Sequence, residues 1–279
     1  MLRARRDRVY APAHESFGTP HGAVPLTLAL LGLVTLLAFV VEATAGFGAT
    51  IVTVTLAAYF MPIAEVLTAL LPANLLLSGY LALKYRRAID TRLLLRRVGV
   101  WMVPGMALGM LPSVLPQLAG LREQGMIRTV FAAFVVVLAA TELWRAFRPR
   151  AGAERALPGP LAAGALVGAG VVHGLFACGG PMLVYVVGRE LTDKARFRAT
   201  LSAVWLALNL VLVVSYVAAG TINAQSLRGS GVMLGSLVGG LVIGEWVHRR
   251  LSVERFRLAV FTLLLFAGGA LLVRSLWER

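Results

Sequence analysis

The sequence predicts an all-α integral membrane protein made of two inverted repeats, each a broken helical hairpin followed by three transmembrane helices. Three observations predict this class: an apolar composition with long uncharged runs, a weak internal repeat, and basic residues gathered in alternate loops. The chain is 58% hydrophobic and 14% charged, with a mean hydropathy of +0.80, far from the averages of soluble domains. Many uncharged runs approach the roughly 20 residues that cross a bilayer core of about 30 Å.

The chain divides into four parts. A polar, basic N-terminal tail (1–22) precedes a first membrane repeat (23–147), a cytoplasmic linker (148–158) and a second membrane repeat (159–279). The tail is followed by no clear small-residue cleavage site, so we interpret it as a tail rather than a removable signal. The formal charge of +14 comes from arginines beside apolar spans. This pattern indicates a bilayer as partner and no nucleic acid.

The two halves match when the chain is shifted by about 130 residues. Asn74 and Asn209 correspond at a slightly larger offset, and the other matched pairs are Glu42 with His173, Gly48 with Gly179, Gly105 with Gly235, Gly109 with Gly239 and Phe131 with Phe261. An ancient duplication leaves such weak identity. The alternative is a chance alignment of helices rich in alanine, leucine and glycine.

Loop charge predicts the orientation of the halves. The basic loops are expected in the cytoplasm, and they are Lys84–Arg97, Arg145–Arg155, Arg189–Arg198 and His248–Arg257. The segment Leu157–Gly188 lies between two of them, so it must begin and end on the same side and therefore fold back as a hairpin. By analogy, Val24–Phe60 forms the first hairpin. The alternative makes Val24–Phe60 one long kinked crossing, with the tail inside.

Each hairpin bends at a glycine-rich break. The breaks are Glu42-Ala-Thr-Ala-Gly-Phe-Gly-Ala-Thr50 and His173-Gly-Leu-Phe-Ala-Cys-Gly-Gly-Pro181. In lipid, such breaks are tolerated where the freed backbone groups line a cavity, and paired breaks in two halves indicate a transport site. The second arms are expected to begin at Thr50 and Pro181, and helix N-termini bind anions. The alternative is that the breaks only allow tight packing, as we expect of Gly105 with Gly109 and Gly235 with Gly239.

The breaks supply most of the candidate substrate-binding residues. These are Gly46, Phe47, Gly48, Thr50, Cys178, Gly179 and Gly180. Glu42 and His173 are the nearest ionisable residues, and an ionisable group at membrane depth can carry a proton, so they are candidates for proton coupling. In the alternative account, Glu42 caps the second arm and His173 hydrogen-bonds a neighbouring carbonyl.

Further polar candidates lie on the first full crossing of each half. Asn74 and Asn209, matched in both halves, are predicted to bind substrate, and Trp205, which shares a helix face with Asn209, to wall off its organic part. For Ser78 and Ser202 we favour hydrogen bonding between helices.

The sequence resembles the TauE/SafE sulfite-exporter family, also called the toluene-sulfonate uptake permeases. The resemblance rests on the two breaks together with Pro62-Ile-Ala-Glu65, Leu71-Pro-Ala-Asn74, Lys84-Tyr-Arg-Arg87 and Arg196-Phe-Arg198. It implies a secondary transporter of small sulfur-containing or organic anions, such as sulfite, sulfonates or sulfoacetate, in a bacterial inner membrane.

Other classes find little support in the sequence. No two carboxylates are placed for acid–base catalysis, and the histidines lack metal-ligand spacing, so we expect no catalytic residues, metal or cofactor. Cys178 is the single cysteine. A non-transporting scaffold or assembly subunit would explain the glycine-rich packing but not the buried Glu42 and His173. A homodimer is left open.

Overall fold

The computed structural model describes residues 23–45, 48–114, 124–147, 156–191, 193–222, 224–250 and 253–278. All regular structure in these residues is helical, and eight of their helices are long and apolar enough to cross a membrane. The predicted class, an all-α multi-span membrane protein, is confirmed. The tail, Gly46, Phe47 and most of the linker lie outside the described residues.

The helices follow the predicted order in each half. The first half contains the hairpin arms α2 (Ala23–Ala45) and α3 (Ala49–Ala57), then α4 (Ile63–Lys84), the short turns η1 (Arg86–Ala88), α5 (Thr91–Leu93) and η2 (Leu94–Gly99), then α6 (Val100–Val114) and α7 (Gln124–Ala146). The second half contains the hairpin arms α8 (Gly159–Phe176) and α9 (Gly180–Val187), then α10 (Lys194–Ala218), α11 (Ala224–Arg250) and α12 (Val253–Trp277).

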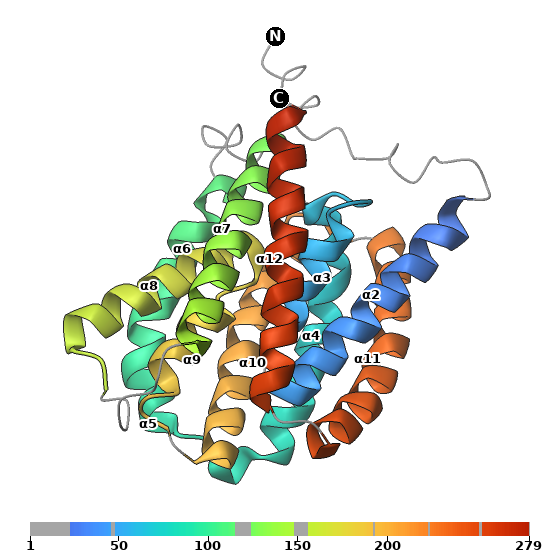
Figure 1. The fold of residues 1–279 in the computed structure, drawn as a ribbon. Helices are drawn as coiled ribbons and strands as arrows, with labels where there is room; N and C mark the ends of the chain where they lie inside the picture. The colour runs from blue at the N-terminus through green and yellow to red at the C-terminus, as the bar shows by residue number, and fades with distance from the viewer. Residues whose placement is uncertain are drawn as a thin grey trace.

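Both hairpins are present, and the two arms of each pack against one another. In Figure 1, α2 begins on the upper side and α3 returns to that side before α4, while α9 runs to the lower side, where α10 begins. This arrangement supports the hairpin over the single kinked crossing. The second arms begin one residue earlier than expected, at Ala49 and Gly180.

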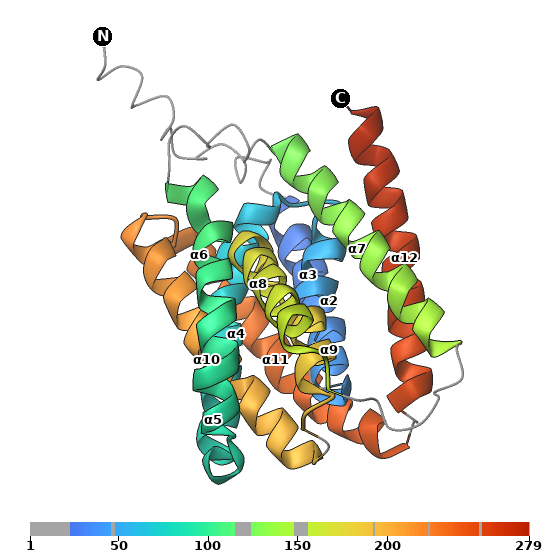
Figure 2. The same ribbon diagram turned by 90° about the vertical axis from the view of Figure 1, so that its left-hand side faces the viewer.

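The basic connections gather toward the lower side (Figures 1 and 2), which the positive-inside rule makes cytoplasmic. Ion pairs join them: Arg196 lies 2.8 Å from Asp90, and Arg97 lies 2.9 Å from Glu190. Since equivalent helices of the halves run in opposite directions, the arrangement is consistent with inverted repeats.

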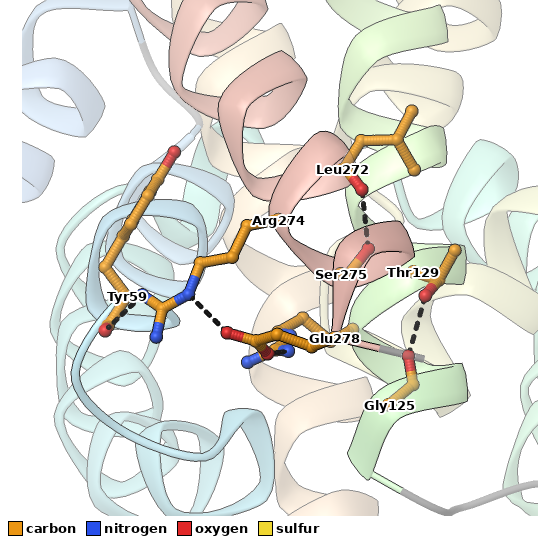
Figure 3. Close-up of polar contacts among 8 residues, drawn as sticks. Tyr59, Gly125, Thr129, Leu272, Arg274, Ser275 and Glu278 are labelled. Atoms are coloured by element: carbon orange, nitrogen blue, oxygen red, sulfur yellow. Dashed lines mark hydrogen bonds and ion pairs between the residues drawn. The ribbon is translucent and has the colours of Figure 1, made fainter.

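On the upper side, the C-terminal end of α12 contacts two other parts of the chain (Figure 3). Glu278 pairs with Arg128 at the start of α7 and with Arg274, whose Nε lies 2.7 Å away. A guanidinium N–H of Arg274 also donates to the Tyr59 carbonyl, at 3.3 Å, in the connection between α3 and α4. Exposed pairs of this kind contribute at most about 1 kcal/mol each, so the network positions these ends more than it stabilises them.

The hairpin of each half packs against a helix of the other half. The most extensive contacts are α11 on α2 and α6 on α8, so the first arm of each hairpin packs against a helix of the other half. Close approach needs glycine: a Cβ on Gly105 or Gly109 would lie 2.2 Å from the carbonyl oxygen of Val167 or Val171.

Only one of the two glycines predicted for α11 lies against α2: a Cβ on Gly239 would lie 3.0 Å from Cδ1 of Leu36. A Cβ on Gly235 would have no neighbour within 4 Å, whereas Cβ atoms on Gly240 and Gly244 would lie 2.5 Å from the Cβ atoms of Phe39 and Ala43. The packing prediction was therefore wrong for Gly235. The repeat alignment is displaced here, because matching glycines by spacing alone does not fix which face of the helix is turned inward.

Candidate substrate-binding site

One pocket lies where the two breaks meet α4 and α10. Its volume is about 40 Å³, and its lining residues are Glu42, Gly48, Thr50, Ile51, Asn74, Ser78, His173, Ala177, Cys178, Gly180, Pro181, Trp205 and Asn209. Most of the candidate residues predicted from sequence are therefore brought together by the fold. The exceptions are Gly46 and Phe47, which lie outside the described residues, and Gly179, which is not in the lining.

The first break places the Glu42 side chain at the start of α3. Gly48 has φ +115°, a left-handed conformation that glycine adopts without strain, and it ends the turn between the arms. The Glu42 carboxylate then accepts a hydrogen bond from the Ala49 N–H, at 2.9 Å. The capping role considered for Glu42 is therefore present. The carboxylate also lines the pocket, so capping and proton transfer are compatible.

Thr50 and Asn74 form a polar pair across the pocket wall. The Asn74 amide nitrogen donates to the Thr50 hydroxyl oxygen at 2.9 Å, which leaves the hydroxyl proton of Thr50 free to donate into the pocket. The Asn74 side-chain oxygen is buried and has no hydrogen-bond partner among the described residues. Such an atom is costly to bury in an apolar protein, and a bound solute or water would satisfy it.

The second break is built around Ala177 and Gly179. Ala177 has φ 52°, and its N–H donates to the His173 carbonyl at 2.7 Å, which ends α8. A Cβ on Gly179 would lie 2.3 Å from the Ala169 carbonyl oxygen, so Gly179 serves the packing of the hairpin. Gly180 and Pro181 follow as the first turn of α9 and line the pocket.

His173 stacks on Trp205, with ring centroids 5.6 Å apart and planes 21° from parallel. Both ring nitrogens are buried without a hydrogen-bond partner in the described part of the chain. Asn209 lies near the ring but outside hydrogen-bond geometry. The carbonyl bond considered for His173 is therefore not found in that part, and its nitrogens remain available to a solute.

Three lining residues were missed or weighted differently in the sequence. Ser78 was expected to form a hydrogen bond between helices; its hydroxyl instead donates to the Asn74 carbonyl of its own helix, at 2.7 Å, and the residue also lines the pocket. Ile51 and Ala177 carry no polar signal. Only the geometry of the breaks turns them toward the pocket.

The two broken hairpins enter from opposite faces of a helical membrane protein, and the pocket lies between them. This is the arrangement of secondary transporters. Comparison with known proteins agrees: residues 31–271 match the family model described as "Sulfite exporter TauE/SafE". The chain belongs to the TauE/SafE family of membrane transporters, which confirms the resemblance predicted from its motifs.

One relative in this comparison is the "Probable inner membrane transporter protein TsaS" of Comamonas testosteroni. It is 32% identical over 187 residues, which cover 66% of this chain and 74% of the relative. No solved structure matches the chain.

Proposed function

We propose that this protein is a secondary transporter of small sulfur-containing or organic anions, of the sulfite, sulfonate or sulfoacetate type, in a bacterial inner membrane. The observation that carries the proposal is the convergence of two helix starts, at Gly48–Ile51 and Gly180–Pro181, on one buried pocket. The family description and the name of the relative from Comamonas testosteroni support it.

The pocket chemistry suits an anion with several oxygens. The first N–H groups of α3 and α9 have no acceptor within their own helices, and the helix dipole adds partial positive charge there. The Thr50 hydroxyl and the amides of Asn74 and Asn209 supply further donors. The cavity of about 40 Å³ has room for about three water molecules, which suits a small oxyanion that has lost most of its hydration.

Glu42 makes anion binding depend on protonation. Its carboxylate already accepts from Ala49, at the helix start where the substrate would bind. Two like charges about 4 Å apart repel by about 4 kcal/mol at an effective dielectric constant near 20, which corresponds to about a thousandfold in affinity. The anion therefore binds best when Glu42 is neutral, so anion and proton move together, with His173 as the second ionisable group in the pocket.

Counterflow in proteoliposomes tests the function. Vesicles loaded with unlabelled sulfite, sulfoacetate, taurine or acetate are given a trace of the same labelled solute, and exchange is expected for one or more of the sulfur-containing anions. The matched control is Thr50→Val with Asn74→Ala, which leaves both hairpins in place and is expected to exchange little. If wild-type vesicles exchange none of the solutes, the scaffold alternative is favoured.

A further inference from the structure

A second cavity adjoins the central pocket, which we call the vestibule. Glu42, Ser78 and Trp205 line both spaces, and Leu81, Arg198 and Ser202 line the vestibule alone. The vestibule is narrow, with a volume of about 10 Å³, which is room for about one water molecule. The two spaces therefore meet at the Glu42 carboxylate and the Trp205 ring.

The vestibule lies on the cytoplasmic side of that junction. Leu81 belongs to the last turn of α4 and Arg198 to the second turn of α10, and both helix ends are on the lower side of Figure 1. This is the side on which the basic loops gather. The central pocket therefore has a neighbouring space toward the cytoplasm, and Glu42 stands between the two.

Arg198 is the cation of the vestibule. Its side chain is half-buried, and its guanidinium carbon lies 5.7 Å from the centre of the Tyr85 ring. Among the described residues no carboxylate lies within ion-pair distance of Arg198, and Asp90 is paired with Arg196 instead. The Glu42 carboxylate, which lines the same cavity, interacts with Arg198 electrostatically but makes no ion pair with it. The half-buried guanidinium therefore has N–H donors to offer to an oxyanion.

We propose that Arg198 is a second anion subsite, which the anion contacts on the cytoplasmic side of Glu42 and Trp205 before or after it occupies the central pocket. The subsite rests on the proposed transport function. Arginine suits this role because its planar group binds two oxygens of a sulfonate or sulfite at once. Ser202 fixes the local backbone, since its hydroxyl donates to the Arg198 carbonyl at 2.9 Å.

The first test measures how the positive charge of Arg198 affects charged reagents in the vestibule, and it does not require transport. Ser202→Cys and, separately, Leu81→Cys are placed in a Cys178→Ala background, and inside-out membrane vesicles receive thiosulfonate reagents that carry either a sulfonate or a trimethylammonium group. Both cysteines should react from the cytoplasmic side, and the sulfonate reagent should react faster. Arg198→Gln should lower the ratio of the two rates about tenfold, because one nearby charge is removed, while Arg198→Lys should keep it.

The matched control is Arg87→Gln, which removes an exposed arginine of the same face that lines neither cavity and should leave the ratio unchanged. In proteoliposomes, Arg198→Gln should raise the half-saturating sulfite concentration on the cytoplasmic side about tenfold or more, and Arg87→Gln should not. The subsite is overturned if both cysteines are unreactive from the cytoplasm, or if Arg198→Gln leaves the rate ratio unchanged. If the wild-type protein exchanges no sulfite, the proposed function is contradicted instead, because the measurement with thiol reagents needs no transport.

Discussion

At the scale of single residues, Thr50 offers the cleanest test of anion contact. Its hydroxyl oxygen is occupied by the Asn74 amide, so its proton points to whatever fills the pocket. Thr50→Val keeps the shape of the side chain and removes this donor. A hydrogen bond to a charged group is worth about 1.5–3 kcal/mol, so we expect the half-saturating anion concentration in counterflow to rise roughly tenfold to a hundredfold.

Thr53 and Thr55 supply the control for this change on the same helix. Their hydroxyls are buried, have no partner among the described residues and do not line the pocket. Replacing either by valine should leave transport unchanged and the protein equally or more stable, because an unsatisfied polar group is removed. Equal effects of Thr50→Val and Thr53→Val on transport would show that Thr50 does not contact the anion.

Glu42 can be assigned its role by Glu42→Gln. Glutamine still accepts the hydrogen bond from Ala49, so α3 should remain capped, but it cannot ionise. We expect net transport driven by a pH gradient to collapse while anion exchange survives, measured in the same proteoliposomes with and without the gradient. If net transport keeps the wild-type dependence on the gradient, the carboxylate serves only as a cap, and His173 becomes the remaining candidate for coupling.

The residue-level site could be predicted largely because its chemistry is rare in this sequence. Glu42 and His173 stand out as ionisable groups in apolar runs, and the glycine-rich breaks mark where the backbone leaves its helix. Ile51 and Ala177 could not be found this way, since an apolar residue in an apolar chain gives no signal. Gly179 was expected in the lining as part of the break and as the match of Gly48, but its Cα faces the Ala169 carbonyl so closely that a Cβ would lie 2.3 Å from the oxygen.

At the scale of elements, the second hairpin depends on this difference between adjacent glycines. A Cβ on Gly179 would meet backbone of α8 at 2.3 Å, whereas a Cβ on Gly180 would have Trp205 as its nearest neighbour at an ordinary 3.6 Å. Gly179→Ala should therefore overpack the hairpin at a cost of about 1–3 kcal/mol and lower the Tm measured in detergent. Gly180→Ala should leave the Tm nearly unchanged and affect transport alone.

The control for both changes is Gly164→Ala on the exposed face of α8, where a Cβ has no neighbour within 4 Å. Alanine is the better helix former by about 1 kcal/mol, so the Tm should hold or rise slightly. If Gly179→Ala has a Tm as high as that of Gly164→Ala, the close approach of Gly179 to α8 does not limit the packing of the hairpin.

Helix order was predictable because uncharged runs and basic loops alternate, but helix faces were not. The sequence places glycines on α11 at several spacings, and only the packing of α2 selects Gly240 and Gly244 over Gly235. A repeat offset aligns elements to within a turn of helix. One residue of error then rotates the predicted face by about 100°, since a helix has 3.6 residues per turn.

At the scale of the whole molecule, the two halves are joined through equivalent contacts. In the repeat, α2 corresponds to α8, and α11 corresponds to α6. The contact of α2 with α11 is therefore equivalent to the contact of α8 with α6, and each contact joins a helix of the first half to a helix of the second. The pairs α4 with α10 and α7 with α12 each join equivalent helices. Such exchange fits a twofold relation between the repeats, and it places the two breaks opposite one another around the central pocket.

The inverted relation makes a topological prediction that accessibility of introduced cysteines can check in a Cys178→Ala background. Thr221→Cys follows α10 on the upper side, while Ala88→Cys and Ala195→Cys lie near the basic connections of the lower side. With an impermeant thiol reagent on intact cells, Thr221→Cys should be labelled, and the other two should react only after permeabilisation. If α8 and α9 form a hairpin, they enter and leave the membrane on the cytoplasmic side, and Ala195 lies on that side. Labelling of Ala195→Cys from outside would show that α8 and α9 cross the membrane completely, which would contradict the inverted repeat.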